Sequence, residues 1–220
     1  MKILIACEYS GTVRDAFIAM GNDAVSCDIL PTEKEGPHLP CDVSLILDDG
    51  WDMMIAFPPC TYLTVTANKW FKDQPPRKSG ALVGAARRAA REEAVNFFML
   101  LANAPIPKIA IENPVGIMST RWRKPDHVIC PTMFGHPEPK KTCLWLKGLP
   151  KLQPTELVEP EYHITKSGKR VPRWFFYADK SKGQNHRAKI RSKTFEGVAA
   201  AMASQWGKFG CCPDYLEETT

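Results

Sequence analysis

The first 28 residues, MKILIACEYSGTVRDAFIAMGNDAVSCD, determine the fold that we expect for this chain. Residues 2–6 form a short apolar run typical of a buried strand, and residues 13–20 carry apolar side chains at helical spacing. Residues 24–27 then predict a second strand, which ends at Asp28. A strand, a turn, a helix and a strand in this order form a unit of a parallel sheet, with an acidic residue closing the second strand.

Two later apolar runs predict further strands of the same sheet. Residues 53–56 are followed by FPPC at 57–60, and residues 108–111 are followed by ENP at 112–114. Strands that alternate with helices in this way are typical of an α/β fold with a doubly wound, mostly parallel sheet.

The connections between these strands have their own patterns. Residues 68–80 are polar and contain prolines, which predicts a mobile loop, and the alanine-rich residues 81–102 predict a crossover helix. Further strands are expected at 142–146 and 174–177, and a last helix at 195–206.

Composition places the chain among ordinary globular proteins. Its 220 residues can bury one substantial core, and with 44% hydrophobic and 24% charged residues wholesale disorder is not expected. No apolar run approaches the ~20 residues that span a bilayer, and the N-terminal run lacks a cleavage site, so we expect a soluble, cytoplasmic protein. The eight cysteines show no C-x-x-C spacing, which favours free thiols and no metal site.

Positive charge is unevenly distributed. The formal net charge is only +5, but basic residues concentrate in the C-terminal half of the chain. This distribution suits a surface that binds phosphate groups, although a solvated basic surface explains it equally well. The residues concerned are Arg121, Arg123, Lys124, Lys140, Lys141 and the basic residues of 166–193.

Three polar groups occupy the carboxyl ends of the predicted strands, where ligands collect in such sheets. The first is the turn at 8–11, EYSG, together with Asp28: a glycine lets the backbone approach a ligand, and the acid can accept hydrogen bonds from ribose hydroxyls. A tight turn without a ligand remains the alternative for Gly11.

Cys60 and Glu112 are the other two groups. A thiolate is a strong nucleophile, and the prolines before Cys60 would hold its backbone stiff; a buried structural cysteine is the alternative. Glu112 places a carboxyl group at the end of the next strand, where it could polarise a substrate ring; a helix cap or ion-pair partner is the alternative. Together the two residues predict a catalytic pair.

These motifs resemble those of the cytosine-5 DNA methyltransferases, and more closely their compact, phage- and prophage-encoded relatives. The turn at 6–14 resembles the family's glycine-rich first motif, FPPC at 57–60 its proline–cysteine motif, and IENPVG at 111–116 its glutamate–asparagine motif. The resemblance implies a Rossmann-like class I methyltransferase fold with S-adenosyl-L-methionine as cofactor. The cofactor-binding residues that it implies are Cys7, Glu8, Tyr9, Ser10, Gly11, Asp28, Ile29, Asp42, Pro58 and Thr194.

The segment 134–142, FGHPEPKKT, is similar to the family's next motif but departs from it. Glu138 stands where glutamine is usual, and Lys140 and Thr142 stand where two arginines are usual. A lysine supplies charge but cannot form the two parallel hydrogen bonds of an arginine, so we expect different contacts to the substrate here. Cys60, Glu112 and Lys140 are the catalytic residues that the resemblance implies. The DNA-binding residues are Asn113, Lys141, Arg170, Arg173, Arg187 and Arg191.

The resemblance also divides the chain into three parts. Residues 1–148 would form the catalytic core, 149–191 a small basic and aromatic recognition region, and 192–220 a C-terminal helix that returns to the core. Larger family members carry a sizeable recognition domain where this chain has about forty residues, so sequence readout should be limited. A monomer is favoured.

The activity implied is transfer of a methyl group to carbon 5 of a cytosine flipped out of duplex DNA, through a covalent adduct with Cys60. The setting would be DNA methylation, as in restriction–modification, in a bacterial or phage-infected cell. Two alternatives stay open: a methyltransferase for a cytosine nucleotide or modified base, and a catalytically degenerate homologue that only binds DNA.

Overall fold

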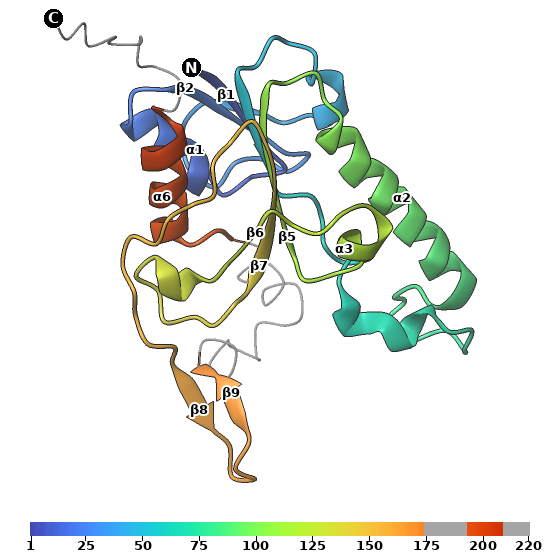
Figure 1. Cartoon of the computed structure of the whole chain (residues 1–220). Helices are drawn as coiled ribbons and strands as arrows, with labels where there is room; N and C mark the ends of the chain where they lie inside the picture. Colours follow the sequence, from blue (N-terminus) through green and yellow to red (C-terminus); the bar gives the residue numbers. More distant parts are fainter. Residues whose placement is uncertain (174–192, 209–220) are drawn as a thin grey trace, which may run out of the picture.

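The computed structural model describes residues 1–173 and 193–208 as a twisted sheet between two layers of helices (Figure 1). The strands are β1 (Lys2–Ala6), β2 (Asp23–Cys27), β3 (His38–Leu39), β4 (Met53–Ala56), β5 (Lys108–Pro114), β6 (His127–Ile129), β7 (Thr142–Lys147), β8 (Tyr162–Ile164) and β9 (Arg170–Pro172). The α-helices are α1 (Thr12–Ala19), α2 (Gly84–Ala102), α3 (Met118–Arg121) and α6 (Glu196–Trp206), and the 3-10 helices are η1 (Val43–Leu45), η2 (Val65–Phe71) and η3 (Pro131–Met133).

The main sheet has seven strands in the order β3-β2-β1-β4-β5-β7-β6. Strands β3, β2, β1, β4 and β5 pair in parallel, and β7 lies antiparallel between β5 and β6. This is a Rossmann-like, doubly wound and mostly parallel sheet, as the sequence predicted. The strand order reverses between β1 and β4, so the carboxyl ends of these two strands form the switch point where such sheets bind ligands.

Both faces of the central strands are buried, which explains why they read as continuous apolar runs. Successive side chains point to opposite faces, so Leu4 packs toward α2 while Ile3 and Ile5 pack toward α1 and α6. Helix α2 covers one face with Phe98, and Figure 1 shows α1 and α6 side by side on the other face.

Most predicted elements are confirmed within one to three residues at each end. The strands expected at 2–6, 24–27, 53–56, 108–111 and 142–146 all form. The predicted strand at 174–177 lies outside the described residues. In the stretch expected to be a loop, residues 72–80 have no helix or strand, and only the first four residues belong to the 3-10 helix η2, which packs on α2.

A separate two-stranded hairpin, β8 and β9, projects away from the sheet (Figure 1). It lies within the region expected to contact DNA, and its turn at 165–169 contains two lysines. Within the described residues, no helix is long and apolar enough to cross a membrane.

Candidate active site

The turn after β1 brings the backbone close to the switch point. Phe57 follows β4, and its amide donates to the Ala6 carbonyl, which joins the ends of β1 and β4. Cys7 and Gly11 both adopt left-handed backbone conformations, with φ of 58° and 72°. A Cβ at Gly11 would lie 2.6 Å from the Arg14 guanidinium, so glycine is required there both by conformation and by space.

Glu8 is a buried carboxylate with one unsatisfied oxygen. Its Oε1 accepts hydrogen bonds from Ser10 Oγ at 2.7 Å and from the Val13 amide at 3.0 Å. Its Oε2 is buried and has no hydrogen-bond partner among the described residues. Because an unpaired buried carboxylate oxygen is costly, this atom is poised to accept from a donor on a ligand.

Glu8 lines the smaller of two pockets near the switch point. This pocket encloses about 240 Å³, counting space open to solvent. Its other lining residues come from the β1 turn, the end of β4 and the segment before α6: Tyr9, Ser10, Phe57, Lys193 and Thr194. The structure thus brings four of the residues predicted to bind the cofactor, Glu8, Tyr9, Ser10 and Thr194, together in one pocket.

The carboxylates predicted to hold the rest of the cofactor lie along the same edge. Asp28 follows β2 and its Oδ1 accepts from the Leu30 amide at 2.9 Å. Asp42 caps η1, and hydrogen bonding from the Ser44 amide lowers the pKa of this exposed carboxyl. Burial raises the pKa of the Cys7 thiol, and the charges of Asp28 and Asp42 raise it further, so these groups are neighbours. All six cysteines in the described part of the chain are free thiols.

Ile29, also predicted to contact the cofactor, is 77% exposed beside Asp28. An apolar side chain held in solvent at this edge is available to cover a flat ring.

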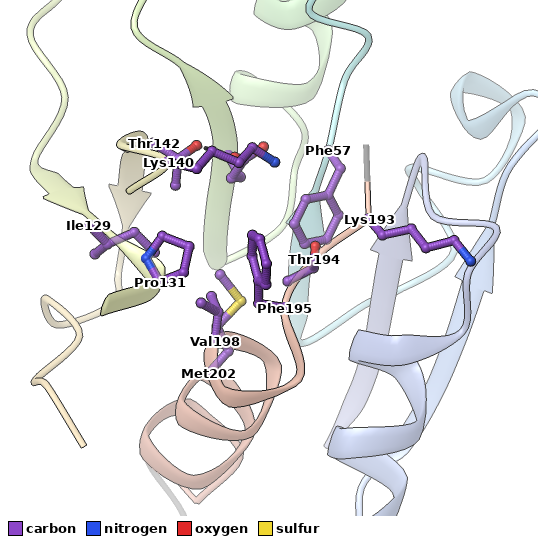
Figure 2. Close-up of a pocket in the computed structure, with 11 residues that line it drawn as sticks. Phe57, Ile129, Pro131, Lys140, Thr142, Lys193, Thr194, Phe195, Val198 and Met202 are labelled. Atoms are coloured by element: carbon purple, nitrogen blue, oxygen red, sulfur yellow. Dashed lines mark hydrogen bonds between the residues drawn. The ribbon is translucent and has the colours of Figure 1, made fainter. Parts of the chain in front are cut away.

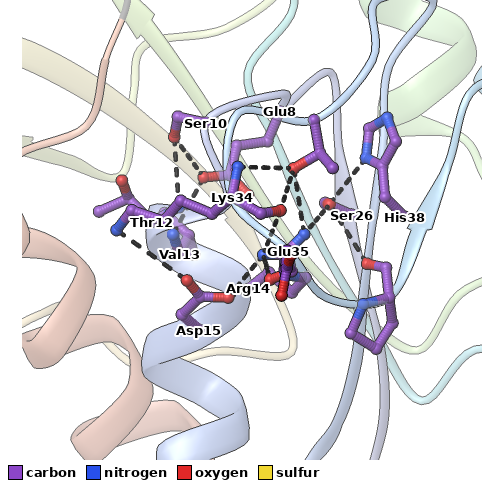
Figure 3. Close-up of polar contacts among 12 residues, drawn as sticks. Glu8, Ser10, Thr12, Val13, Arg14, Asp15, Ser26, Lys34, Glu35 and His38 are labelled. Carbon is purple, nitrogen blue, oxygen red and sulfur yellow. Dashed lines mark hydrogen bonds and ion pairs between the residues drawn. The ribbon is translucent and has the colours of Figure 1, made fainter.

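Arg14 organises the loop that follows β2, as Figure 3 shows. Its guanidinium is completely buried and donates to Thr32 Oγ1 at 3.3 Å and to the Glu35 carbonyl at 2.9 Å, with an ion pair to Asp15 at 2.8 Å. It also donates to Ser26 Oγ and the Lys34 carbonyl. Sequence reasoning missed this residue, because an arginine satisfied by carbonyls leaves no pattern beyond its place on the buried face of α1.

The same loop reaches the smaller pocket. The Glu33 amide donates to the Tyr9 carbonyl at 2.8 Å, and the Glu33 carboxylate pairs with Lys193 at 2.5 Å. Lys193 lines both pockets, so Arg14 supports, through this loop, a contact between the N-terminal turn and the segment before α6.

Replacing Arg14 with methionine is expected to lower the free energy of unfolding by about 2–4 kcal/mol, because several buried acceptors lose their donor. Cofactor affinity should also fall, since the loop with Glu33 loses its anchor. Urea unfolding and calorimetric titration with the cofactor measure both effects. Lys34→Met removes only an exposed 3.9 Å contact to Asp15 in the same network and should leave both values nearly unchanged. Equal effects of the two substitutions would contradict this role.

The larger pocket contains Glu112 and lies on the α6 side of the sheet (Figure 2). It encloses about 380 Å³, counting space open to solvent. Glu112 Oε1 accepts a hydrogen bond from Thr142 Oγ1 on β7, and Lys140 lines the same wall. Apolar side chains complete the pocket: Phe57, Ile129, Pro131, Phe195, Val198 and Met202. Because Phe57, Lys193 and Thr194 line both pockets, the two spaces are neighbours.

Phe57, three residues before Cys60, lines this pocket, but Cys60 itself does not. Cys60 is exposed and lies four positions after the end of β4. Strand β4 pairs with β5 so that Ala56 lies opposite Ile111. The Cys60 segment and Glu112 therefore leave adjacent strands at the same edge of the sheet. The structure brings Glu112, Lys140 and Thr194 together in one pocket and leaves Cys60 outside it.

Asn113 points to the opposite face from Glu112, as alternation along a strand requires. It is 1% exposed, and its Nδ2 donates to the Pro58 carbonyl at 2.9 Å. Its burial is at odds with the predicted contact between Asn113 and DNA. In this structure Asn113 instead ties the segment before Cys60 to β5, and Pro58 is correspondingly buried.

The other predicted DNA-binding residues are spread over the surface. Lys141 is exposed next to the larger pocket. Arg170 on β9 stacks over Tyr162 at 4.2 Å, and Arg173 pairs with Glu161 at 2.8 Å. Arg187 and Arg191 lie outside the described residues. Within residues 1–173 and 193–208, no cluster of side chains could hold a metal ion.

Two solved structures are similar in fold to this chain. One is a protein described as a DNA modification methyltransferase encoded within an E. coli prophage; it matches with a TM-score of 0.43 and 15% identity over 71% of this chain and 51% of its own. The other is a mutant of Spodoptera frugiperda DNMT2, with a TM-score of 0.42 and 16% identity over 73% of this chain and 57% of its own. The chain thus spans little more than half the length of either structure. No family model matches the sequence, and no curated protein is significantly similar to it.

Proposed function

We propose that this protein is an S-adenosylmethionine-dependent DNA methyltransferase that methylates carbon 5 of cytosine, with Cys60 as nucleophile and Glu112 as the group that holds the base. The observation that carries the proposal is the pair of neighbouring pockets at the switch point of the sheet. One holds the unsatisfied carboxylate oxygen of Glu8, and the other holds Glu112 and Lys140.

The smaller pocket and the adjoining strand ends suit the proposed cofactor. Glu8 Oε2 can accept from the ammonium of the methionine part, and Asp28 and Asp42 can accept from the ribose hydroxyls and the adenine amine. The hydrogen-bond acceptors at this edge of the sheet thus suit a cofactor that carries several hydrogen-bond donors. When bound, the cofactor supplies the methyl group that carbon 5 takes, and the sulfonium sulfur leaves with the bonding electrons.

The larger pocket complements the edge of a cytosine. A carboxylate at Glu112 accepts from the exocyclic amine and from a protonated ring nitrogen, while Lys140 can donate to the ring carbonyl. The hydroxyl of Thr142 already holds the Glu112 carboxylate in place. The apolar remainder of the wall suits the flat faces of the base.

In the proposed reaction the Cys60 thiolate forms a bond from Sγ to ring carbon 6, and the electrons of the ring double bond become available at carbon 5. Glu112 stabilises the charge that develops on the ring. After methylation, carbon 5 loses its proton to water, the double bond re-forms and Cys60 leaves as thiolate. Phe57, three residues before Cys60, lines both pockets, and the proposal requires the thiol to reach the open side of the base pocket in the substrate complex.

The DNA substrate is supported by where the charge lies. Residues 61–91 contain seven lysines and arginines and one acid, residues 166–193 contain ten and one, and the rest of the chain is net acidic. Two basic segments in an otherwise acidic chain are suited to a polyanion rather than to a single nucleotide.

The proposal predicts steep salt dependence of DNA binding, with the β8–β9 hairpin as one contact. Changing Lys166, Lys169 and Arg170 to glutamine should reduce the slope of log K against log salt by about 2–3, since each lost phosphate contact removes about 0.9. Fluorescence anisotropy at several salt concentrations measures the slope. The control Lys151→Gln/Lys208→Gln removes exposed charges elsewhere and should change it little. A hairpin variant with an unchanged slope would argue against contact there.

The function itself is tested by incubating the full-length protein with methyl-labelled cofactor and either duplex DNA or deoxycytidine monophosphate. We expect label in DNA, mapped by carbon-5-specific sequencing to cytosine. Label on an amino group, or on the nucleotide alone, would replace the proposed activity with another methyl transfer. DNA binding without any transfer would indicate a degenerate homologue.

A further inference from the structure

Two arginines of α2 hold the backbone directly after Cys60. Arg87 Nη2 donates to the Thr61 carbonyl at 3.4 Å, and Arg91 Nε donates to the Tyr62 carbonyl at 2.9 Å. The two arginines are four residues apart in the helix, so they project from the same face. The carbonyls of Thr61 and Tyr62, directly after the proposed nucleophile, therefore accept hydrogen bonds from successive turns of one helix.

The opposite side of this segment is held by β5 and the turn after it. Asn113 Nδ2 donates to the Pro58 carbonyl at 2.9 Å, and the Ile117 amide donates to the Leu63 carbonyl at 2.8 Å. A Cβ at Gly116 would approach the Leu63 carbonyl oxygen to 2.3 Å, so glycine permits this contact. The segment with the proposed nucleophile is thus fixed from two sides.

Arg87 and Arg91 do not serve as ordinary ion-pair partners. No ion pair in the described part of the chain includes either of them. Arg87 is 5% exposed and lies over the rings of Tyr62 and Phe71, and Arg91 lies 3.3 Å from the Phe71 centroid. Burial lowers the pKa of Arg91, and the nearby charge of Arg87 lowers it further.

Placing two like charges together costs stability, and within the described part of the chain neither arginine has a carboxylate as an ion-pair partner; the charge of Glu92 counters the cost at Arg91 only in part. Apolar side chains of similar length could fill this space at a lower cost in stability. Two features distinguish the arginines from such side chains: donors directed at the carbonyls of Thr61 and Tyr62, and positive charges that contact the two residues after Cys60. Both features bear on a thiol that must point in one direction and react as thiolate.

We propose that Arg87 and Arg91 are positioning residues for Cys60: their hydrogen bonds fix the direction of its thiol, and their charges favour the thiolate. The inference rests on the proposed role of Cys60 as nucleophile.

The test compares Arg91→Met and Arg87→Met with Arg88→Met in the full-length protein. Arg88 is the matched control because it lies on the same helix but is exposed and binds the Phe71 carbonyl and Asp73, away from Cys60. We expect kcat to fall about 100-fold in the first two variants, as a small displacement of a reacting group can cause, with KM and cofactor affinity within about two-fold. Arg88→Met should resemble the unmodified protein in kcat and cofactor affinity; the comparison does not use its KM for DNA, because Arg88 belongs to the basic segment 61–91.

A second readout does not depend on methyl transfer. Alkylation of Cys60 by iodoacetamide, followed across pH by peptide mass spectrometry, should shift to higher pH by roughly half a unit or more in Arg87→Met and Arg91→Met. A purely structural role would change stability but not this profile. Arg91→Lys should restore the profile, because charge is kept, but not kcat, because a lysine cannot reproduce the guanidinium hydrogen bonds.

The outcomes separate the inference from the proposed function. Identical kcat and alkylation profiles in Arg91→Met and Arg88→Met would overturn the inference. If the unmodified protein transfers no methyl group and the alkylation shift is still present, the inference stands and the proposed activity is wrong. If methionine at either position prevents folding, Arg91→Lys decides: a folded variant with unmodified kcat would overturn the inference.

Discussion

Serine in place of Cys60 is expected to abolish methyl transfer to DNA while leaving cofactor affinity within about two-fold. A serine hydroxyl has nearly the size of the thiol but stays protonated near neutral pH and is a much weaker nucleophile than a thiolate, so addition to ring carbon 6 should slow by at least roughly 10³-fold. The residues of the smaller pocket do not include Cys60, so cofactor binding should persist. Transfer of labelled methyl groups and calorimetric titration with the cofactor measure the two effects.

The matched control is the double variant Cys211→Ser/Cys212→Ser, which removes two thiols from the C-terminal end of the chain. It should retain full transfer, which separates the loss of one nucleophile from a general effect of fewer thiols. A covalent complex between protein and DNA should form with the control and not with Cys60→Ser. Comparable turnover in the unmodified protein, in Cys60→Ser and in the double variant would exclude the covalent mechanism, although the description of the fold would still stand.

The sheet could be predicted from the sequence because each of its central strands is buried on both faces and reads as an unbroken apolar run. The shorter elements could not. Strand β3 has two residues and β6 has three, so both are too short to show the alternation of apolar and polar residues that predicts a strand. The 3-10 helix η2 is also too short for a periodic pattern, and two arginines of α2 donate hydrogen bonds to its Phe71 carbonyl and its Asn68 side chain.

The candidate site was predictable where it consists of residues at strand ends, because the carboxyl ends of parallel strands converge at one edge. Glu8, Asp28 and Glu112 follow this rule. Arg14, Arg87 and Arg91 could not be found in the same way, since their partners are mostly backbone carbonyls far away in the chain. The direction of a side chain after two prolines is equally invisible to sequence, which is why the placement of Cys60 outside the pocket of Glu112 emerges only from the structure.

Glutamine in place of Glu112 is expected to lower kcat about 10²–10³-fold with little change in stability. The amide preserves the size of the side chain and can still accept a hydrogen bond from Thr142. It carries no negative charge, however, so it cannot stabilise a protonated ring nitrogen as charge develops on the base, and loss of one such interaction costs this much in other enzymes. The KM for DNA should change less than kcat, because the interaction strengthens during the reaction.

Glu92→Gln is the control for this substitution. Glu92 forms an exposed ion pair with Arg121 on α3, so its replacement removes one carboxylate without touching either pocket. Single-turnover transfer with saturating DNA distinguishes the chemical step from binding, and thermal unfolding shows whether the variants fold alike. A Glu112→Gln protein that binds DNA more weakly but transfers the methyl group at the unmodified rate would move Glu112 from the chemistry to substrate recognition. A tenfold or greater loss in the single-turnover rate, with Glu92→Gln unaffected, would place the carboxylate beside the reacting ring.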